Sequence, residues 1–198
     1  MKIRSFISLD LPLSLKYELS GHAKLIAGQD KRQKIRWLPP ENYHLTLVFL
    51  GEIESAILAG LQFALERKLE SKKAVPLTIS AIIPFPFSRP RIAAALVERT
   101  AELLQLQSNV TNCVRKYGIT PERRRFVPHV TLGRLKQRAG KTVDFKVRNI
   151  LLSGIADSVT LFQSELSPDG AIHTALAEIP LRTLPEEKRG NRIFCCLK

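Results

Sequence analysis

A short motif with a histidine and a threonine occurs twice in the chain. It reads His44-Leu45-Thr46-Leu47 in the first copy and His129-Val130-Thr131-Leu132 in the second. In an extended strand, successive side chains alternate between the two faces, so each histidine shares a face with its threonine and the apolar residues point the other way. Each copy therefore offers an imidazole and a hydroxyl group on an apolar support.

Two such copies that meet at one cleft would form an acid–base pair. The ordinary pKa of histidine is about 6.5, so near neutral pH one imidazole can be neutral and the other protonated. The neutral ring can take a proton from water, and the protonated ring can give one to a leaving oxygen. Thr46 and Thr131 could donate hydrogen bonds to the phosphate oxygens. A cyclic phosphodiester suits this arrangement, because in-line attack by water needs a base on one side of phosphorus and an acid on the other.

Other chemistries lack their sequence motifs. The histidines belong to no HExxH pattern and no cluster of carboxylates, so we expect neither a metal nor another cofactor. There is also no Walker loop for a nucleoside triphosphate. The two other histidines, His22 and His173, have no threonine two residues later. The cysteines Cys113, Cys195 and Cys196 fit neither a disulfide framework nor a metal site.

Composition favours a basic, folded protein that meets polyanions. The 198 residues are 44% hydrophobic and 25% charged, as expected for a single globular core. The 31 Lys and Arg residues outnumber the 18 Asp and Glu residues, which gives a net charge of +13. This charge favours nucleic acid as the partner. No apolar run could span a bilayer and the N-terminal segment alternates, so we expect a cytoplasmic protein with no membrane contact. No obligate protein partner is apparent from the sequence, and we expect a monomer.

The predicted elements follow the order of a duplicated α+β unit. Alternation predicts strands over residues 3–9, 43–50, 75–85, 91–98, 127–135, 159–166 and 172–179. Apolar spacing of three or four predicts helices over 13–26, 52–70, 100–117 and 144–152, with Thr100 as a cap and Gly118 as a stop. We expect two pseudo-symmetric lobes, each an antiparallel sheet with helices packed outside, and an active-site cleft between them. Residues 1–184 would form this single bilobal domain, and 185–198 a polar C-terminal tail.

Arginines lie close to both motifs in the sequence. The basic stretch 31–36 precedes the first motif, Arg123 to Arg125 precede the second, and Arg134 follows His129 by five residues. In a regular strand this odd spacing would point Arg134 away from His129. Gly133 permits a bulge that would turn the arginine back towards the histidine.

Two aromatic residues near the motifs are candidates for stacking on a nucleobase. Trp37 precedes the first motif and Phe126 precedes the second. Aromatic side chains stack on bases of any sequence, but each of these two could equally belong to the core.

The chain resembles the RNA 2′,3′-cyclic phosphodiesterases of the two-histidine phosphoesterase superfamily, also called 2′-5′ RNA ligase-like. The matching stretches occur in the family's order and reach about residue 182: RSFISLDLP, IRWLPPENYHLTLVFLGEI, FSRPRI, RRRFVPHVTLGRLK and LFQSELSPDGAIHTAL. Two positions depart from the family pattern. Asp169-Gly170 and His173 stand where the family usually has Gly-Pro and then an aromatic residue, and the segment after Arg91 lacks a tryptophan-like residue.

This resemblance implies a bilobal α+β fold and metal-independent hydrolysis of RNA or nucleotide 2′,3′-cyclic phosphate to a 2′-phosphomonoester. It implies that His44 is the proton donor and His129 the proton acceptor. It further implies that Thr46, Thr131 and Arg134 bind the phosphate. The residues by themselves leave two other functions open, namely 2′-5′ RNA end-joining by the reverse chemistry and RNA binding without catalysis in the basic cleft.

Overall fold

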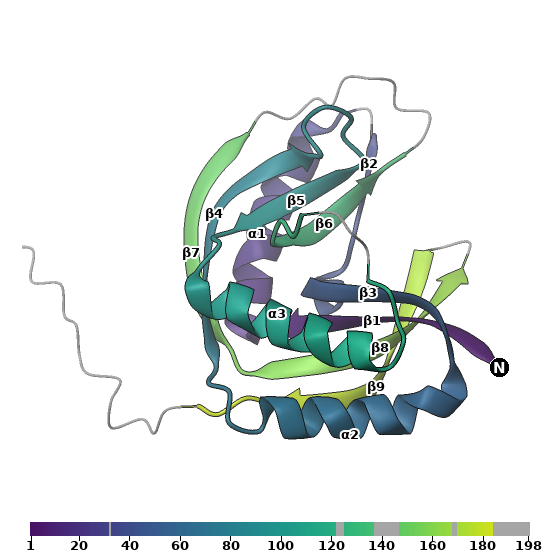
Figure 1. Cartoon of the computed structure of the whole chain (residues 1–198). Coiled ribbons are helices and arrows are strands. Elements are labelled where there is room, and N and C mark those ends of the chain that lie inside the picture. The colour runs from purple at the N-terminus through teal and green to yellow at the C-terminus, as the bar shows by residue number, and fades with distance from the viewer. Residues whose placement is uncertain (32, 122–124, 137–146, 168–169, 184–198) are drawn as a thin grey trace, which may run out of the picture.

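The computed structural model describes residues 1–31, 33–121, 125–136, 147–167 and 170–183 (Figure 1). Within these ranges the strands are β1 (Lys2–Asp10), β2 (Ile35–Trp37), β3 (His44–Glu54), β4 (Val75–Phe85), β5 (Ile92–Val97), β6 (His129–Leu135), β7 (Arg148–Ala156), β8 (Ser158–Ser167) and β9 (Gly170–Pro180). The α-helices are α1 (Leu13–Gln29), α2 (Leu58–Leu69) and α3 (Ala101–Lys116), with short 3-10 helices at Pro40–Asn42 and Ser55–Ile57.

The described strands form one antiparallel sheet with the two motif strands at its centre. The order is β7-β4-β5-β6-β3-β1-β8-β9, and β2 pairs with β6 outside this path. The motif strands β3 and β6 pair with each other at Leu45 and Val130, and three further strands follow on either side. The predicted α+β class is confirmed. The division into two lobes with a cleft between them stays a prediction.

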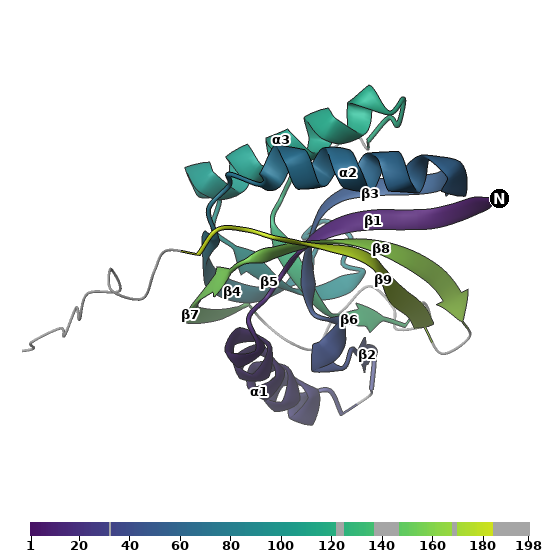
Figure 2. The same ribbon diagram turned by 90° about the horizontal axis from the view of Figure 1, so that it is seen from below.

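The helices cover the sheet from different sides. Figure 2 shows α2 and α3 side by side on one side of the strands and α1 on the other. Leu15, Leu19 and Ile26 of α1 are buried, as the apolar spacing requires. Thr100 caps α3 as predicted, because its side chain accepts a hydrogen bond from the backbone N–H of Leu103. No helix in the described ranges is long and apolar enough to cross a membrane.

The motif strands are anchored by their apolar side chains. Leu45, Leu47, Val130 and Leu132 are all buried in the hydrophobic core, whereas the motif histidines and threonines are half-buried. Burying a leucine or valine side chain contributes about 1.5–3 kcal/mol each. The core therefore fixes the polar face of each motif through the apolar face of the same strand.

Two predicted helices need correction. The prediction of a helix over 144–152 is wrong, because Arg148–Ala156 is strand β7 and pairs with β4. Burial alternates along this strand, but the outward-facing Leu151 is apolar although it is 79% exposed. The sequence therefore does not show the alternation of apolar and polar residues that predicts a strand. Residues 144–146, like the tail 185–198, lie outside the described residues. The helix predicted from residue 52 begins only at Leu58, because β3 continues to Glu54 and buries Ile53 opposite Ile3 of β1.

Candidate active site

The two motif histidines are held by the same hydrogen bond. His44 Nδ1 lies 2.9 Å from the carbonyl oxygen of Asn42, and His129 Nδ1 lies 2.8 Å from that of Val127. A carbonyl oxygen only accepts, so each Nδ1 carries a proton and donates it. In the neutral ring, Nε2 then keeps its lone pair. Both imidazoles are thus fixed in the tautomer that presents Nε2 for proton transfer.

The strand register brings the four polar motif side chains to one face. Counting outwards from the antiparallel pair Leu45–Val130, Thr131 lies beside His44 and Thr46 lies beside His129. Residues that oppose each other in such a pair share a face of the sheet. Each imidazole therefore has a threonine one pleat away on its own strand and another across the strand pair.

A bulge in β6 turns Arg134 towards this face. Ala94 of β5 pairs with Thr131 and Ala93 pairs with Gly133, so two steps along β6 match one step along β5. The extra residue reverses the alternation, and Arg134 shares a face with Thr131. The bulge predicted at Gly133 is confirmed.

Gly133 is also required by the close approach of β2. A Cβ atom at this position would lie 2.6 Å from Ile35 Cγ2 and 3.1 Å from the carbonyl oxygen of Arg36. Trp37 Cε3 would lie 3.2 Å from the same atom, and Trp37 pairs with Gly133. Trp37 therefore packs on the face away from Arg134, half-buried against the core, and Phe126 packs against the core as well. The structure does not bring either aromatic side chain into contact with the histidines.

Aromatic rings surround His44. Phe6 of β1 stacks on it with ring centroids 5.0 Å apart, and Phe162 of β8 stacks on Phe6 at 5.2 Å. His173 of β9 approaches His44 edge-on, with centroids 5.5 Å apart and an angle of 89° between the rings. His129 has one such neighbour among the described residues, Phe85 at 4.9 Å.

Sequence reasoning missed these neighbours. Phe6, Phe162 and His173 are far from His44 in the sequence and reach it only through the pairing of β3, β1, β8 and β9. The signal that could have found His173 was its departure from the family pattern. No comparable signal marked the two phenylalanines, because a phenylalanine in an alternating strand is ordinarily a core residue.

The surroundings of His44 favour its neutral form. Burial lowers the pKa of His44 to about 4, and the charge of His173 acts in the same direction, followed by those of Lys16 and Arg134. The hydrogen bond to Asn42 opposes these effects. The pKa of His173 is also lowered, first by burial and then by Arg134. Because one guanidinium acts on both rings, Arg134 lies within electrostatic range of both.

The two halves of the site differ in the residue beside the histidine. Asp10 of β1 pairs with His44, and its carboxylate accepts hydrogen bonds from Thr160 and from Ser158, the latter at 3.3 Å. Burial raises the pKa of Asp10, against the hydrogen bonds and the charge of Lys16. The residue that pairs with His129 is Leu96 of β5. The Asp10 carboxylate is thus held by Thr160 and Ser158 of β8, and the strand partner of His129 is aliphatic.

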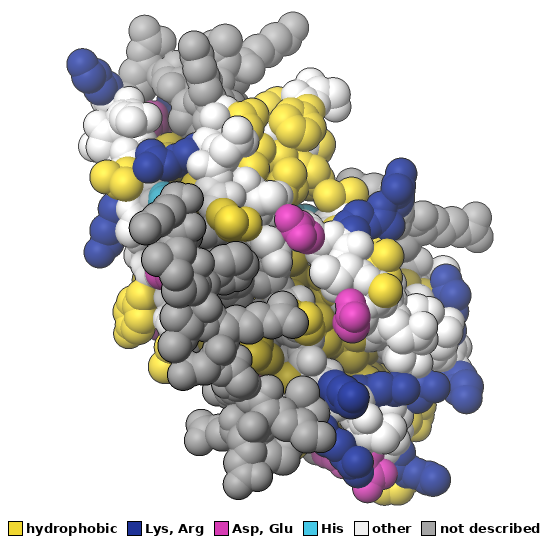
Figure 3. Space-filling model, turned by 90° about the vertical axis from the view of Figure 1, so that its left-hand side faces the viewer, with side chains coloured by type: hydrophobic (Ala, Val, Ile, Leu, Met, Phe, Trp, Pro, Cys, Tyr) yellow, Lys and Arg dark blue, Asp and Glu magenta, His cyan; other side chains and the backbone are white. Residues whose placement is uncertain are grey.

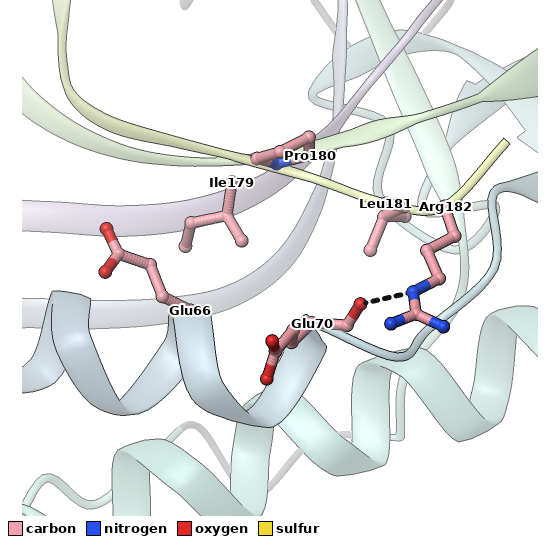
Figure 4. Close-up of a pocket in the computed structure, with 6 residues that line it drawn as sticks. All are labelled: Glu66, Glu70, Ile179, Pro180, Leu181 and Arg182. Atoms are coloured by element: carbon pink, nitrogen blue, oxygen red, sulfur yellow. Dashed lines mark hydrogen bonds between the residues drawn. The ribbon is translucent and has the colours of Figure 1, made fainter.

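A separate pocket of about 300 Å³ lies between α2 and the end of β9 (Figure 4). There the Nε of Arg182 donates a hydrogen bond to the carbonyl oxygen of Glu70 over 3.0 Å. The pocket contains no residue of either motif, and its contacts join the end of β9 to α2. No group of three His, Cys, Asp or Glu side chains in the described ranges could hold a metal ion.

The chain belongs to the 2′-5′ RNA ligase superfamily, whose family model matches residues 26–150. The resemblance seen in the two motifs is thereby confirmed. Similar proteins include the RNA 2′,3′-cyclic phosphodiesterase of Methanothermobacter thermautotrophicus, 29% identical over 180 residues that cover 88% of this chain and 96% of that protein. The RNA 2′,3′-cyclic phosphodiesterase of Aquifex aeolicus is 31% identical over 155 residues, or 74% of this chain and 81% of that protein.

Solved structures share the fold. The crystal structure of the protein TT0787 of Thermus thermophilus matches with a TM-score of 0.79 and 23% identity, over 91% of this chain and 99% of that one. The crystal structure of E. coli LigT complexed with 3′-AMP matches with a TM-score of 0.73 and 22% identity, over the same shares of both chains. At these identities, the two structures support the α+β architecture described above.

Proposed function

We propose that this protein is a metal-independent phosphodiesterase that hydrolyses the 2′,3′-cyclic phosphate of RNA or a nucleotide to a 2′-phosphomonoester. The observation that carries the proposal is the matched pair of imidazoles on neighbouring strands, each with Nδ1 bound to the carbonyl oxygen two residues earlier. Similar proteins named RNA 2′,3′-cyclic phosphodiesterase support the choice of substrate.

The reaction needs one base and one acid. His129 Nε2 takes a proton from water as the water oxygen bonds to phosphorus, the bond from phosphorus to O3′ breaks, and His44 Nε2 gives its proton to O3′. Thr46 and Thr131 donate hydrogen bonds to the non-bridging oxygens, and the Arg134 guanidinium offsets their growing negative charge. Protons balance, because the product gains one water while His129 ends protonated and His44 neutral.

The donor role of His44 depends on the substrate's own charge. With a pKa lowered to about 4, His44 is neutral at pH 7. A phosphate anion next to Nε2 favours the protonated ring and raises its pKa.

Phosphorus NMR on a purified 2′,3′-cyclic nucleotide tests this function. The wild-type protein should convert the cyclic phosphate to the 2′-phosphomonoester in the presence of EDTA. His44→Ala and His129→Ala should each lose roughly 10²- to 10⁴-fold in kcat, the usual contribution of one general acid or base. His22→Ala serves as a matched control, because His22 lies on α1 outside the motifs. Full activity of both motif variants, or a 3′-phosphate product, would contradict the proposal.

A further inference from the structure

Two arginines oppose each other directly beside the histidine face. Arg36 of β2 pairs with Arg134 of β6 across the antiparallel ladder, so the two side chains share a face. The bulge places the Arg134 side chain on the same face as Thr131. Because Arg36 lies opposite Arg134, its side chain is on that face as well. Lys136 lies two residues beyond Arg134, where its backbone N–H donates a hydrogen bond to the carbonyl oxygen of Lys34 over 2.8 Å. The three cations form a row that leads away from the histidines.

This row is electrostatically unfavourable in the protein alone. Like charges directly opposite each other in a sheet are destabilising. Within the described residues, Arg36, Arg134 and Lys136 make no ion pair with an acidic side chain. The side chains of Arg36 and Lys136 are exposed, so both can reach a ligand. An anion between the cations would remove the repulsion.

A pocket of about 490 Å³ adjoins the row. It lies between the C-terminal end of α1 and the β2–β6 pair, lined by Ala27, Asp30, Gln33, Ile35, Arg36, Trp37 and Lys136. Asp30 is buried, and its carboxylate oxygens accept hydrogen bonds from the backbone N–H groups of Lys34 and Ile35 at 3.0 and 2.9 Å. The Asp30 carboxylate is therefore satisfied by the backbone and forms no ion pair with Arg36 or Lys136. These two cations can bind an anionic ligand.

We propose that Arg36 and Lys136 form a subsite for the RNA backbone, which binds the phosphodiester preceding the terminal cyclic phosphate. The inference rests on the proposed function and narrows it, because it makes the end of an RNA strand a better substrate than a free cyclic nucleotide. Arg134 binds the terminal phosphate beside the histidines, and Arg36 holds the next phosphate along the strand. Contacts to backbone phosphates carry no base preference.

The strong basic balance of the chain agrees with this subsite. Figure 3 shows Lys and Arg side chains recurring along the edges of one face with few acidic side chains among them. Such a surface attracts a polyanion without positioning it. Arg36 and Arg134 differ from this general basic surface, because their pairing places two cations at a defined position next to the proposed reaction centre.

A comparison of two substrates tests the subsite. One is a 2′,3′-cyclic mononucleotide, and the other is a six-nucleotide RNA with the same terminal base and a 2′,3′-cyclic phosphate. The double variant R36A/K136A should lose roughly tenfold or more in kcat/KM on the RNA, since each charged hydrogen bond is strong. Its loss on the mononucleotide should be clearly smaller. The slope of log(kcat/KM) against log[salt] on the RNA should shrink by about 0.7, because the subsite neutralises one phosphate of a single strand.

The matched control is the double variant R67A/K68A, which removes the same charge from exposed positions on α2. It should leave the ratio between the two substrates unchanged. Equal losses on both substrates in R36A/K136A, or an equal change of the ratio in the control, would overturn the subsite. Should R36A/K136A melt at a lower temperature than wild type, the single variant R36Q replaces it with the same expected direction.

Direct binding separates this inference from the proposed function. A six-nucleotide RNA with an ordinary 3′-hydroxyl end can be followed by fluorescence anisotropy without any turnover. Weaker and less salt-dependent binding by R36A/K136A than by R67A/K68A supports the subsite even if no cyclic phosphate is hydrolysed. Equal binding by the two variants contradicts it whether or not the protein is a phosphodiesterase.

Discussion

Replacing His173 with phenylalanine should raise the pKa of His44. The two ring centroids lie 5.5 Å apart, and the charge of His173 is the largest influence after burial that lowers the pKa of His44. At this separation, two unit charges repel by about 0.8 kcal/mol at the dielectric constant of water and by about 3 kcal/mol at an effective value of 20. These limits correspond to about 0.5 and about 2 pKa units. A phenylalanine keeps a ring against Phe6 and removes only the charge.

The assay is an NMR titration of the His44 ring in wild type and in H173F. Removing a like charge favours the protonated form, so the pKa must move upwards. The other charges that act on the pKa of His44 are those of Lys16 and Arg134, and the substitution leaves both residues in place. The variant H22F on α1 is the control and should leave the pKa of His44 unchanged. An unaltered or lower pKa of His44 in H173F would show that the charge of His173 does not act on the His44 ring.

Three further predictions follow from the same geometry. Gly133→Ala should lower the free energy of unfolding by about 1–3 kcal/mol, because its Cβ would lie 2.6 Å from Ile35 Cγ2; a urea midpoint equal to wild type would contradict this tight packing. As the pH falls from 6.5 to 4, the free energy of unfolding of the wild type should decrease, because the unfolded chain binds a proton at His44 that the folded chain does not. His44→Gln should flatten the plot of this free energy, measured by urea unfolding, against pH. An identical slope in the variant would argue against a buried neutral ring. Thr46→Val and Thr131→Val should each lower kcat/KM on a cyclic nucleotide roughly tenfold, as expected for a lost hydrogen bond to a charged group; unchanged kinetics in both would remove the threonines from the site.

The sequence was sufficient for those parts of the site that depend on neighbouring residues. Strand alternation predicted that Leu45 and Val130 anchor the strands while the histidines and threonines share the other face. The glycine at 133 predicted the bulge that turns Arg134. Both properties follow from the geometry of a single strand, which a sequence specifies locally.

The surroundings of the histidines could not be predicted in the same way. His173 reaches His44 through three successive strand pairings, and the registers of those pairings are set by the whole sheet. The unequal neighbours Asp10 and Leu96 also depend on register. Strand β7 was missed for another reason, because its outward Leu151 is apolar and exposed and conceals the alternation. Long-range pairing, rather than local propensity, determines the electrostatics of the site.

The proposed reaction requires both imidazoles to flank one phosphate. Titration of the protein with a 2′-nucleotide, the expected product, tests it directly when the ring resonances of His44 and His129 are followed together by NMR. Both rings should shift along one binding curve with a single Kd and one nucleotide bound. A shift confined to one ring, or two curves with different Kd values, would contradict it.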